Sequence, residues 1–122
     1  MARVYHFDIV VRDFERASAF YKAAFGWDTQ KWDGPMEYWF AITGDDAEDG
    51  INGGISVGEP NMTSGQLTLH VDSVDATVDK VVAAGGKLTG EKRAVPGVGW
   101  LADVADTEGN VFGLMEEDPE AR

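Results

Sequence analysis

A chain of 122 residues is long enough for one folded domain with a single apolar core, and we expect residues 1–122 to form one. It contains no cysteine, which excludes disulfides, thiolate catalysis, iron–sulfur clusters and cysteine-ligated zinc. Its 22 acidic residues outnumber its 10 lysines and arginines, and the net charge of −12 argues against nucleic acid or anionic membranes as partners.

The first half of the chain predicts a strand, a helix and three further strands. Residues 4–11 alternate between an apolar face and a face that carries His6 and Asp8, which is typical of a half-buried strand. A helix should begin after Asp13, a good N-cap, and end at Gly26. Three short strands with turn residues between them are then expected at 27–32, 38–42 and 51–57.

The same order of elements starts again at Gln66. A strand is expected at 66–71, Ser73 caps a helix that Gly85 and Gly86 terminate, and a last strand covers 111–116. An offset of about 60 residues superposes these caps and stops on those of the first half, which indicates an internal duplication. We therefore predict a module at 4–57, a linker at 58–65, a second module at 66–116 and a polar, frayed tail at 117–122.

Five segments, in this order and spacing, resemble the glyoxalase/bleomycin-resistance/extradiol-dioxygenase group, the vicinal-oxygen-chelate superfamily. They are His6–Ile9, Phe20–Trp27, Gly50–Gly54, Pro96–Trp100 and Asp106–Phe112. The resemblance covers essentially the whole chain and is closest to a glyoxalase-like branch of uncharacterised reaction. It implies an α+β fold in which two tandem βαβββ modules form a cupped, partly closed mixed sheet with helices on its outer face. It also implies a homodimer.

Enzymes of this superfamily hold a divalent metal with four side chains, and the resemblance places those positions at His6, Gly53, Gln66 and Gly113. Glycine offers no side-chain donor, so both usual carboxylate positions are vacant. A catalytic metal needs about three protein ligands. Only His6 and Gln66 remain, with Asp8 as a conceivable third donor. We therefore expect no metal and no other cofactor; if a divalent metal is bound, His6 and Gln66 are its expected ligands.

His6 and Asp8 are the candidate catalytic pair, because an imidazole titrates near neutral pH and a neighbouring carboxylate can orient it. The alternative is that both residues only line a solvated hollow. An offset of 61 residues aligns Trp39 with Trp100, and an offset of 60 aligns Gly53 with Gly113. The two tryptophans are candidate aromatic walls for a flat ligand, with core packing as the alternative. The other candidate ligand-binding residues are Asn52, Gly53, Gln66, Thr68 and Gly113.

These features favour a metal-independent protein that binds a small, partly aromatic or apolar molecule and either sequesters it or acts on it. The alternatives are a divalent-metal-dependent lyase, isomerase or dioxygenase, and an antibiotic-sequestering or non-catalytic interaction module. Whether the protein is an enzyme stays open at this level. No nucleic-acid or membrane partner is expected, and without an apolar leader or a span of about 18 apolar residues we expect a cytoplasmic protein.

Overall fold

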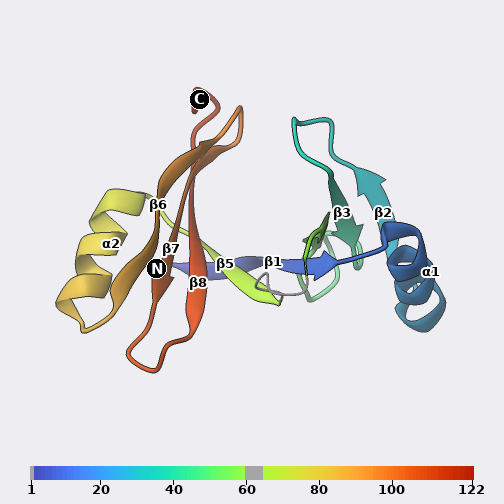
Figure 1. Ribbon diagram of the computed structural model, residues 1–122, viewed down its shortest axis with the longest axis horizontal. Coiled ribbons are helices and arrows are strands. Elements are labelled where there is room, and N and C mark those ends of the chain that lie inside the picture. The colour runs from blue at the N-terminus through green and yellow to red at the C-terminus, as the bar shows by residue number, and fades with distance from the viewer. Residues whose placement is uncertain (1, 60–64) are drawn as a thin grey trace. The chain divides into compact units, whose positions relative to one another are not determined.

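The computed structural model describes residues 2–59 and 65–122 (Figure 1). Its elements in chain order are β1 (Arg3–Val11), α1 (Phe14–Phe25), β2 (Asp28–Lys31), β3 (Tyr38–Ile42), β4 (Gly53–Val57), β5 (Gln66–His70), α2 (Val74–Ala83), β6 (Lys87–Val95), β7 (Gly99–Ala105) and β8 (Val111–Glu117). Each half has the order βαβββ, which confirms the predicted α+β fold of two modules. Most of the linker expected at 58–65 lies outside the described residues.

The strands form a mixed sheet with the hydrogen-bonded order β2-β3-β4-β1-β5-β8-β7-β6, which is not closed because β2 and β6 are its two ends. Within the first module, β1 and β4 are parallel and the other pairs are antiparallel. The second module repeats this pattern, with β5 parallel to β8. The chain divides into two compact units, His6–Gln66 and Leu67–Arg122 with the residues up to Tyr5, and each is described by itself.

Local sequence fixes the beginnings of both helices, as predicted. The Asp13 carboxylate accepts a hydrogen bond from the Arg16 N–H at 3.0 Å, and the Ser73 hydroxyl accepts one from the Ala76 N–H at 3.1 Å. Gly26 ends α1 in the left-handed conformation with φ of 77°. Among the residues that the structure describes, neither helix is long and apolar enough to span a bilayer.

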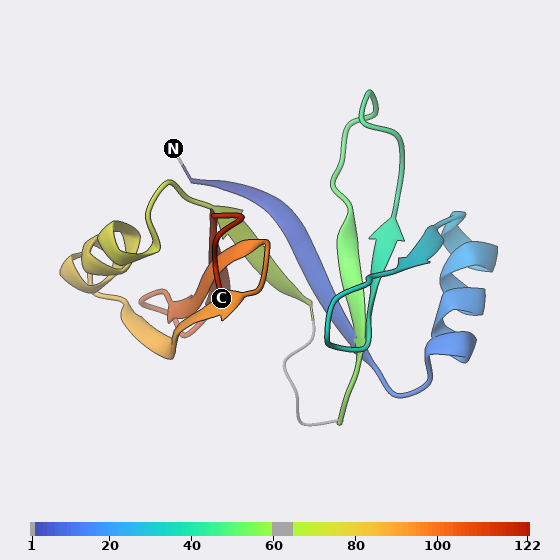
Figure 2. The same cartoon turned by 90° about the horizontal axis from the view of Figure 1, so that it is seen from above.

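In the first module, α1 lies beside β2 (Figure 2) and also contacts β4. The Phe14 ring stacks on Trp39 with centroids 3.9 Å apart, and the Phe7 ring lies 5.7 Å from Trp27. Ile55 of β4 is completely buried. The apolar face that the alternation of β1 predicts is therefore the face covered by α1.

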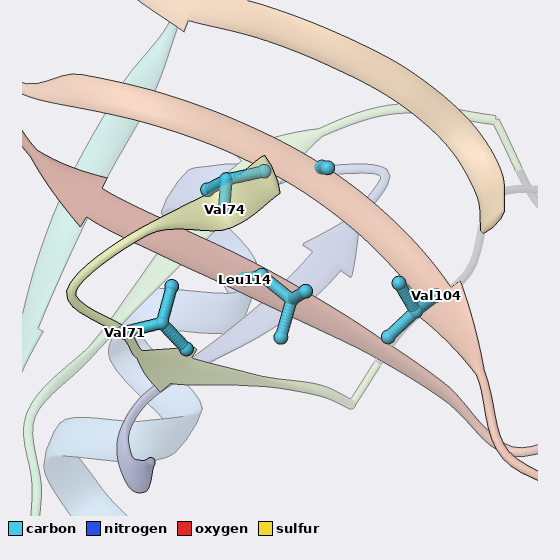
Figure 3. Close-up of a cluster of buried hydrophobic side chains, with 5 residues drawn as sticks. Val71, Val74, Val104 and Leu114 are labelled. Atoms are coloured by element: carbon cyan, nitrogen blue, oxygen red, sulfur yellow. The ribbon is translucent and has the colours of Figure 1, made fainter. Parts of the chain in front are cut away.

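The second module has its own apolar core between α2 and its sheet. Val71, Val74, Val104 and Leu114 form a buried cluster, drawn in Figure 3, and Trp100 packs against its edge. Complete burial of a side chain such as Leu114 contributes about 1.5–3 kcal/mol.

The residues after β8 pack against the β6–β7 connection instead of fraying as expected. The Gly97 N–H donates to the Ala121 carbonyl at 3.1 Å, and the Asp118 N–H donates to the Val98 carbonyl at 3.0 Å. The indole N–H of Trp100 also donates to the Asp118 carboxylate at 3.0 Å. Ala121 is only 2% exposed as a result. Backbone pairing of this kind was not visible in a polar tail sequence.

Candidate active site

Strand pairing in the first module gathers polar side chains on the face opposite α1. Asp8 of β1 lies across from Gly54 of β4, and Gly54 lies across from Phe40 of β3. Because alternate residues of a strand share a face, His6 and Tyr38 lie on this same face. The face therefore carries two ionisable groups from β1 and a phenol from β3.

Three polar groups meet there, and we call them the His6–Asp8–Tyr38 cluster. The His6 Nε2 atom lies 2.6 Å from the Tyr38 hydroxyl and 3.2 Å from the Asp8 Oδ1 atom. The Tyr38 hydroxyl donates to the same Asp8 Oδ1 atom at 2.8 Å. The side chains of His6 and Asp8 are 26% and 36% exposed, so the cluster is partly withdrawn from water but open to a ligand.

The single proton of the Tyr38 hydroxyl restricts how the cluster is protonated. When this hydroxyl donates to Asp8, its oxygen is left to accept from His6, so the neutral imidazole carries its proton on Nε2. Burial, followed by the negative charge of Asp8 and the hydrogen bond to it, raises the pKa of Tyr38 well above its ordinary value. Tyr38 therefore stays protonated and remains a donor at neutral pH.

The two glycines that begin β4 face opposite sides of the sheet. A Cβ atom on Gly54 would overlap the Tyr38 hydroxyl, whereas a Cβ atom on Gly53 would lie 2.6 Å from the Phe7 ring on the α1 side. Gly53 thus makes room for core packing, and Gly54 makes room for the cluster.

The strand register changes the alignment of the two modules by one residue. Asp8 pairs with Gly54, and its counterpart Thr68 pairs with Gly113. Gly113 therefore corresponds to Gly54 and not to Gly53, the residue that the sequence offset matches with it. The vacant carboxylate position of the first module is accordingly residue 54.

The donor set does not fit the divalent metal that the superfamily resemblance implies. The corresponding positions hold His6, Gln66 and two glycines, and the space beside Gly54 is filled by a phenol. Across residues 2–59 and 65–122, no group of three His, Cys, Asp or Glu side chains is arranged to hold a metal ion.

Both candidate wall tryptophans lie on the helix-covered faces of their modules. Trp39 lies between the Phe14 ring, 3.9 Å away, and the Lys31 ammonium, 5.5 Å from its centroid. Trp100 packs on the core of the second module and donates to Asp118. These positions match the core-packing alternative for both residues.

The aromatic rings beside the cluster are Trp32 and Phe40, and not the predicted Trp39 and Trp100. Trp32 and Phe40 each lie edge to face with Tyr38, with centroids 5.9 Å apart in both pairs. Phe40 is 39% exposed, and Gly34 leaves space that the Trp32 ring occupies. These two rings and Tyr38 are not among the site residues predicted from the sequence, although strict alternation within 38–42 separates Tyr38 and Phe40 from Trp39.

The remaining predicted site residues have separate positions. The Asn52 side chain accepts a hydrogen bond from the Thr43 N–H at 2.9 Å and so holds the connection between β3 and β4. Gln66 begins β5 and is half-buried. Thr68 is buried, and it pairs across the sheet with Gly113.

The duplicated βαβββ order defines a protein of the vicinal-oxygen-chelate superfamily. Within it, the chain belongs to the glyoxalase-like domain family, whose model matches residues 6–115.

Relatives of this chain carry several activities in their names. A Vibrio cholerae protein named as a probable lactoylglutathione lyase is 27% identical over 124 residues, covering 93% of this chain and 90% of that protein. A Mycobacterium tuberculosis protein with the name "Putative glyoxylase CFP32" is 38% identical over 50 residues, which is 41% of this chain and only 19% of that protein's length.

Two solved structures share the fold. Methylmalonyl-CoA epimerase from Mycobacterium tuberculosis superposes with a TM-score of 0.68 at 16% identity, over 95% of this chain and 88% of that chain. The Mn(II)-bound glyoxalase from Novosphingobium aromaticivorans gives 0.66 at 23% identity, over 99% of this chain and 41% of that chain. At these identities the structures establish the common fold alone.

Proposed function

We propose that the protein binds a small, partly aromatic carbonyl compound at the His6–Asp8–Tyr38 cluster, and that the cluster carries out metal-independent proton transfer on it. The observation that carries this proposal is the Tyr38 hydroxyl placed 2.6 Å from an imidazole nitrogen and 2.8 Å from a carboxylate oxygen. The name of the Vibrio cholerae relative supports the ligand class, since lactoylglutathione contains carbonyl groups.

The surroundings of the cluster favour a flat ligand. Trp32 and Phe40 offer apolar ring surface beside Tyr38, and the cluster offers a few directed polar groups. Apolar walls with a few polar groups that fix orientation are the usual composition of a small-molecule site. A bound ring would cover the exposed part of Phe40.

The cluster supplies the groups that general acid–base catalysis requires. A ligand carbonyl oxygen that takes the place of the Tyr38 oxygen as acceptor receives a hydrogen bond from the His6 Nε2–H, which polarises the carbonyl group, while the Tyr38 hydroxyl keeps its hydrogen bond to Asp8. The Asp8 carboxylate is the acceptor for a proton leaving the adjacent carbon. When Asp8 gives this proton back to a different atom of the ligand, the double bond has shifted and no oxidation state has changed, so the reaction class is an isomerisation.

A thermal-shift screen of aromatic and carbonyl compounds tests the binding site. A compound bound at the cluster raises the melting temperature of the wild type, and its effect should fall sharply in Phe40→Ala and Tyr38→Phe. Phe25→Ala is the matched control, because Phe25 is 61% exposed on α1 and away from the cluster face. Equal shifts in all four proteins, or no shift with any compound, would contradict the proposed site.

Metal independence is tested by elemental analysis of protein purified without a metal-affinity tag, before and after chelation and reloading. We expect no divalent metal to be retained at stoichiometric amounts. A near-stoichiometric metal that chelation removes and that His6→Ala fails to bind would overturn this part of the proposal and favour the metal-dependent lyase or dioxygenase.

A further inference from the structure

We propose that Tyr38 and Gly54 form a pair that decides which chemistry the site supports: the Tyr38 phenol closes a latent divalent-cation site, and residue 54 is glycine to admit that phenol. This inference concerns the same cluster as the proposed function. It does not depend on which ligand the cluster binds, because its tests use no organic ligand.

The first step is that the phenol and a side chain at residue 54 compete for one space. A Cβ atom built on Gly54 would overlap the hydroxyl and the adjoining ring carbon of Tyr38. The overlapping atoms belong to a side chain whose hydroxyl is held by two partners, so the phenol is not free to turn aside without losing them. Any larger residue at 54 therefore requires that Tyr38 be removed or displaced.

The second step is that this space adjoins the two other polar groups. The Tyr38 hydroxyl is hydrogen-bonded to the His6 Nε2 atom and the Asp8 Oδ1 atom, and both of these atoms can act as ligands of a cation. A carboxylate on residue 54 would therefore point toward His6 and Asp8. One imidazole and two carboxylates are a common ligand set for divalent transition metals.

The third step is that the second module lacks the phenol. Tyr38 lies two pairs along the β3–β4 ladder from Phe40 and Gly54, and the corresponding position beyond Asp103 and Gly113 on the β7–β8 ladder is Leu101. The glycine therefore occurs in both modules, but the register position that holds Tyr38 in the first module holds a leucine in the second. The phenol is a feature of this site and not a requirement of the repeated fold.

A double-mutant cycle tests the competition for space. We expect Gly54→Ala to lower the melting temperature of the otherwise unchanged protein and to lower it much less when Tyr38→Ala is already present. Gly53→Ala is the matched control, because its added methyl group meets the Phe7 ring on the other face and should be equally harmful in both backgrounds. The proposed pair is refuted if Tyr38→Ala reduces the drop in melting temperature caused by Gly54→Ala no more than it reduces the drop caused by Gly53→Ala.

Calorimetric titration with Mn²⁺ or Zn²⁺ alone tests the latent site in the double variant Gly54→Glu with Tyr38→Ala. We expect it to bind the ion roughly tenfold or more tightly than the wild type, and His6→Ala should abolish the gain. A folded double variant, as judged by circular dichroism, that binds metal no better than the wild type would overturn the latent site. Failure of the ligand screen with success here would reject the proposed function and leave this inference standing.

Discussion

Replacing Tyr38 with phenylalanine measures how much the cluster stabilises the protein. The change keeps the ring and removes the hydroxyl that lies 2.8 Å from Asp8 and 2.6 Å from His6. A hydrogen bond to a charged group contributes about 1.5–3 kcal/mol. Because the Asp8 side chain is 36% exposed, water replaces part of the lost interaction. We expect the free energy of unfolding to fall by about 1–2 kcal/mol at pH 7.

The same substitution should also remove a loss of stability that the wild type suffers at high pH. Burial, and then the charge of Asp8 and its hydrogen bond, raise the pKa of Tyr38 in the folded protein above the ordinary value of 10.0. Above pH 10 the unfolded chain therefore loses a proton that the folded protein keeps. The stability that this group contributes is complete below pH 10 and falls as the pH rises further, by up to about 1.4 kcal/mol per pH unit. Tyr38→Phe lacks this loss, so the two proteins should converge.

Urea unfolding followed by far-ultraviolet circular dichroism between pH 7 and pH 11 measures both effects. Tyr21→Phe is the control, since Tyr21 stacks on Trp27 on the α1 side of the sheet. Equal stability of the wild type and Tyr38→Phe at pH 7 would refute the energetic argument, and a gap that stayed constant up to pH 11 would refute the titration argument.

Two further predictions concern the second module. Leu114→Ala removes a completely buried side chain from the core of this module and should lower the free energy of unfolding, measured by chemical denaturation, by about 2–5 kcal/mol. A decrease below about 1 kcal/mol would mean that Leu114 is not packed as described. The indole N–H of Trp100, followed by the Glu120 N–H, lowers the pKa of Asp118, so this stabilisation is present above the ordinary carboxyl pKa and lost as pH falls through the lowered value. Trp100→Phe should therefore be less stable than the wild type at neutral pH and approach it in acid, as urea unfolding at pH 7 and below about pH 4 will show.

Alternation along β1 was sufficient to place His6 and Asp8 on one face, because its other face is uniformly apolar. The run of β3 gave no such contrast, since Tyr38, Trp39 and Phe40 are all aromatic. The direction of each ring became evident only from the pairing of β3 with β4, which puts Phe40 opposite Gly54. Pairing depends on residues far apart in the chain, and local periodicity does not report it.

The offset of about 60 residues located the helices of the second module correctly but misaligned its strands. Trp39 lies opposite Ile55, and the residue in the same place of the second module is Ala102, opposite Leu114. The connection between β3 and β4 is longer than the one between β7 and β8, so no single offset aligns both strands. Trp39 and Trp100 are therefore not counterparts, although each packs on the helix side of its own module.

The two ends of the strand order also determine how the protein behaves when it is concentrated. β2 has only four residues, and β6 shifts its register on both sides of Gly90. Short and bulged edge strands are poor templates for a strand from another chain. With the repulsion that a net charge of −12 adds, these edges should resist fibril growth, and a variant without the irregularity at Gly90 should lose part of that resistance.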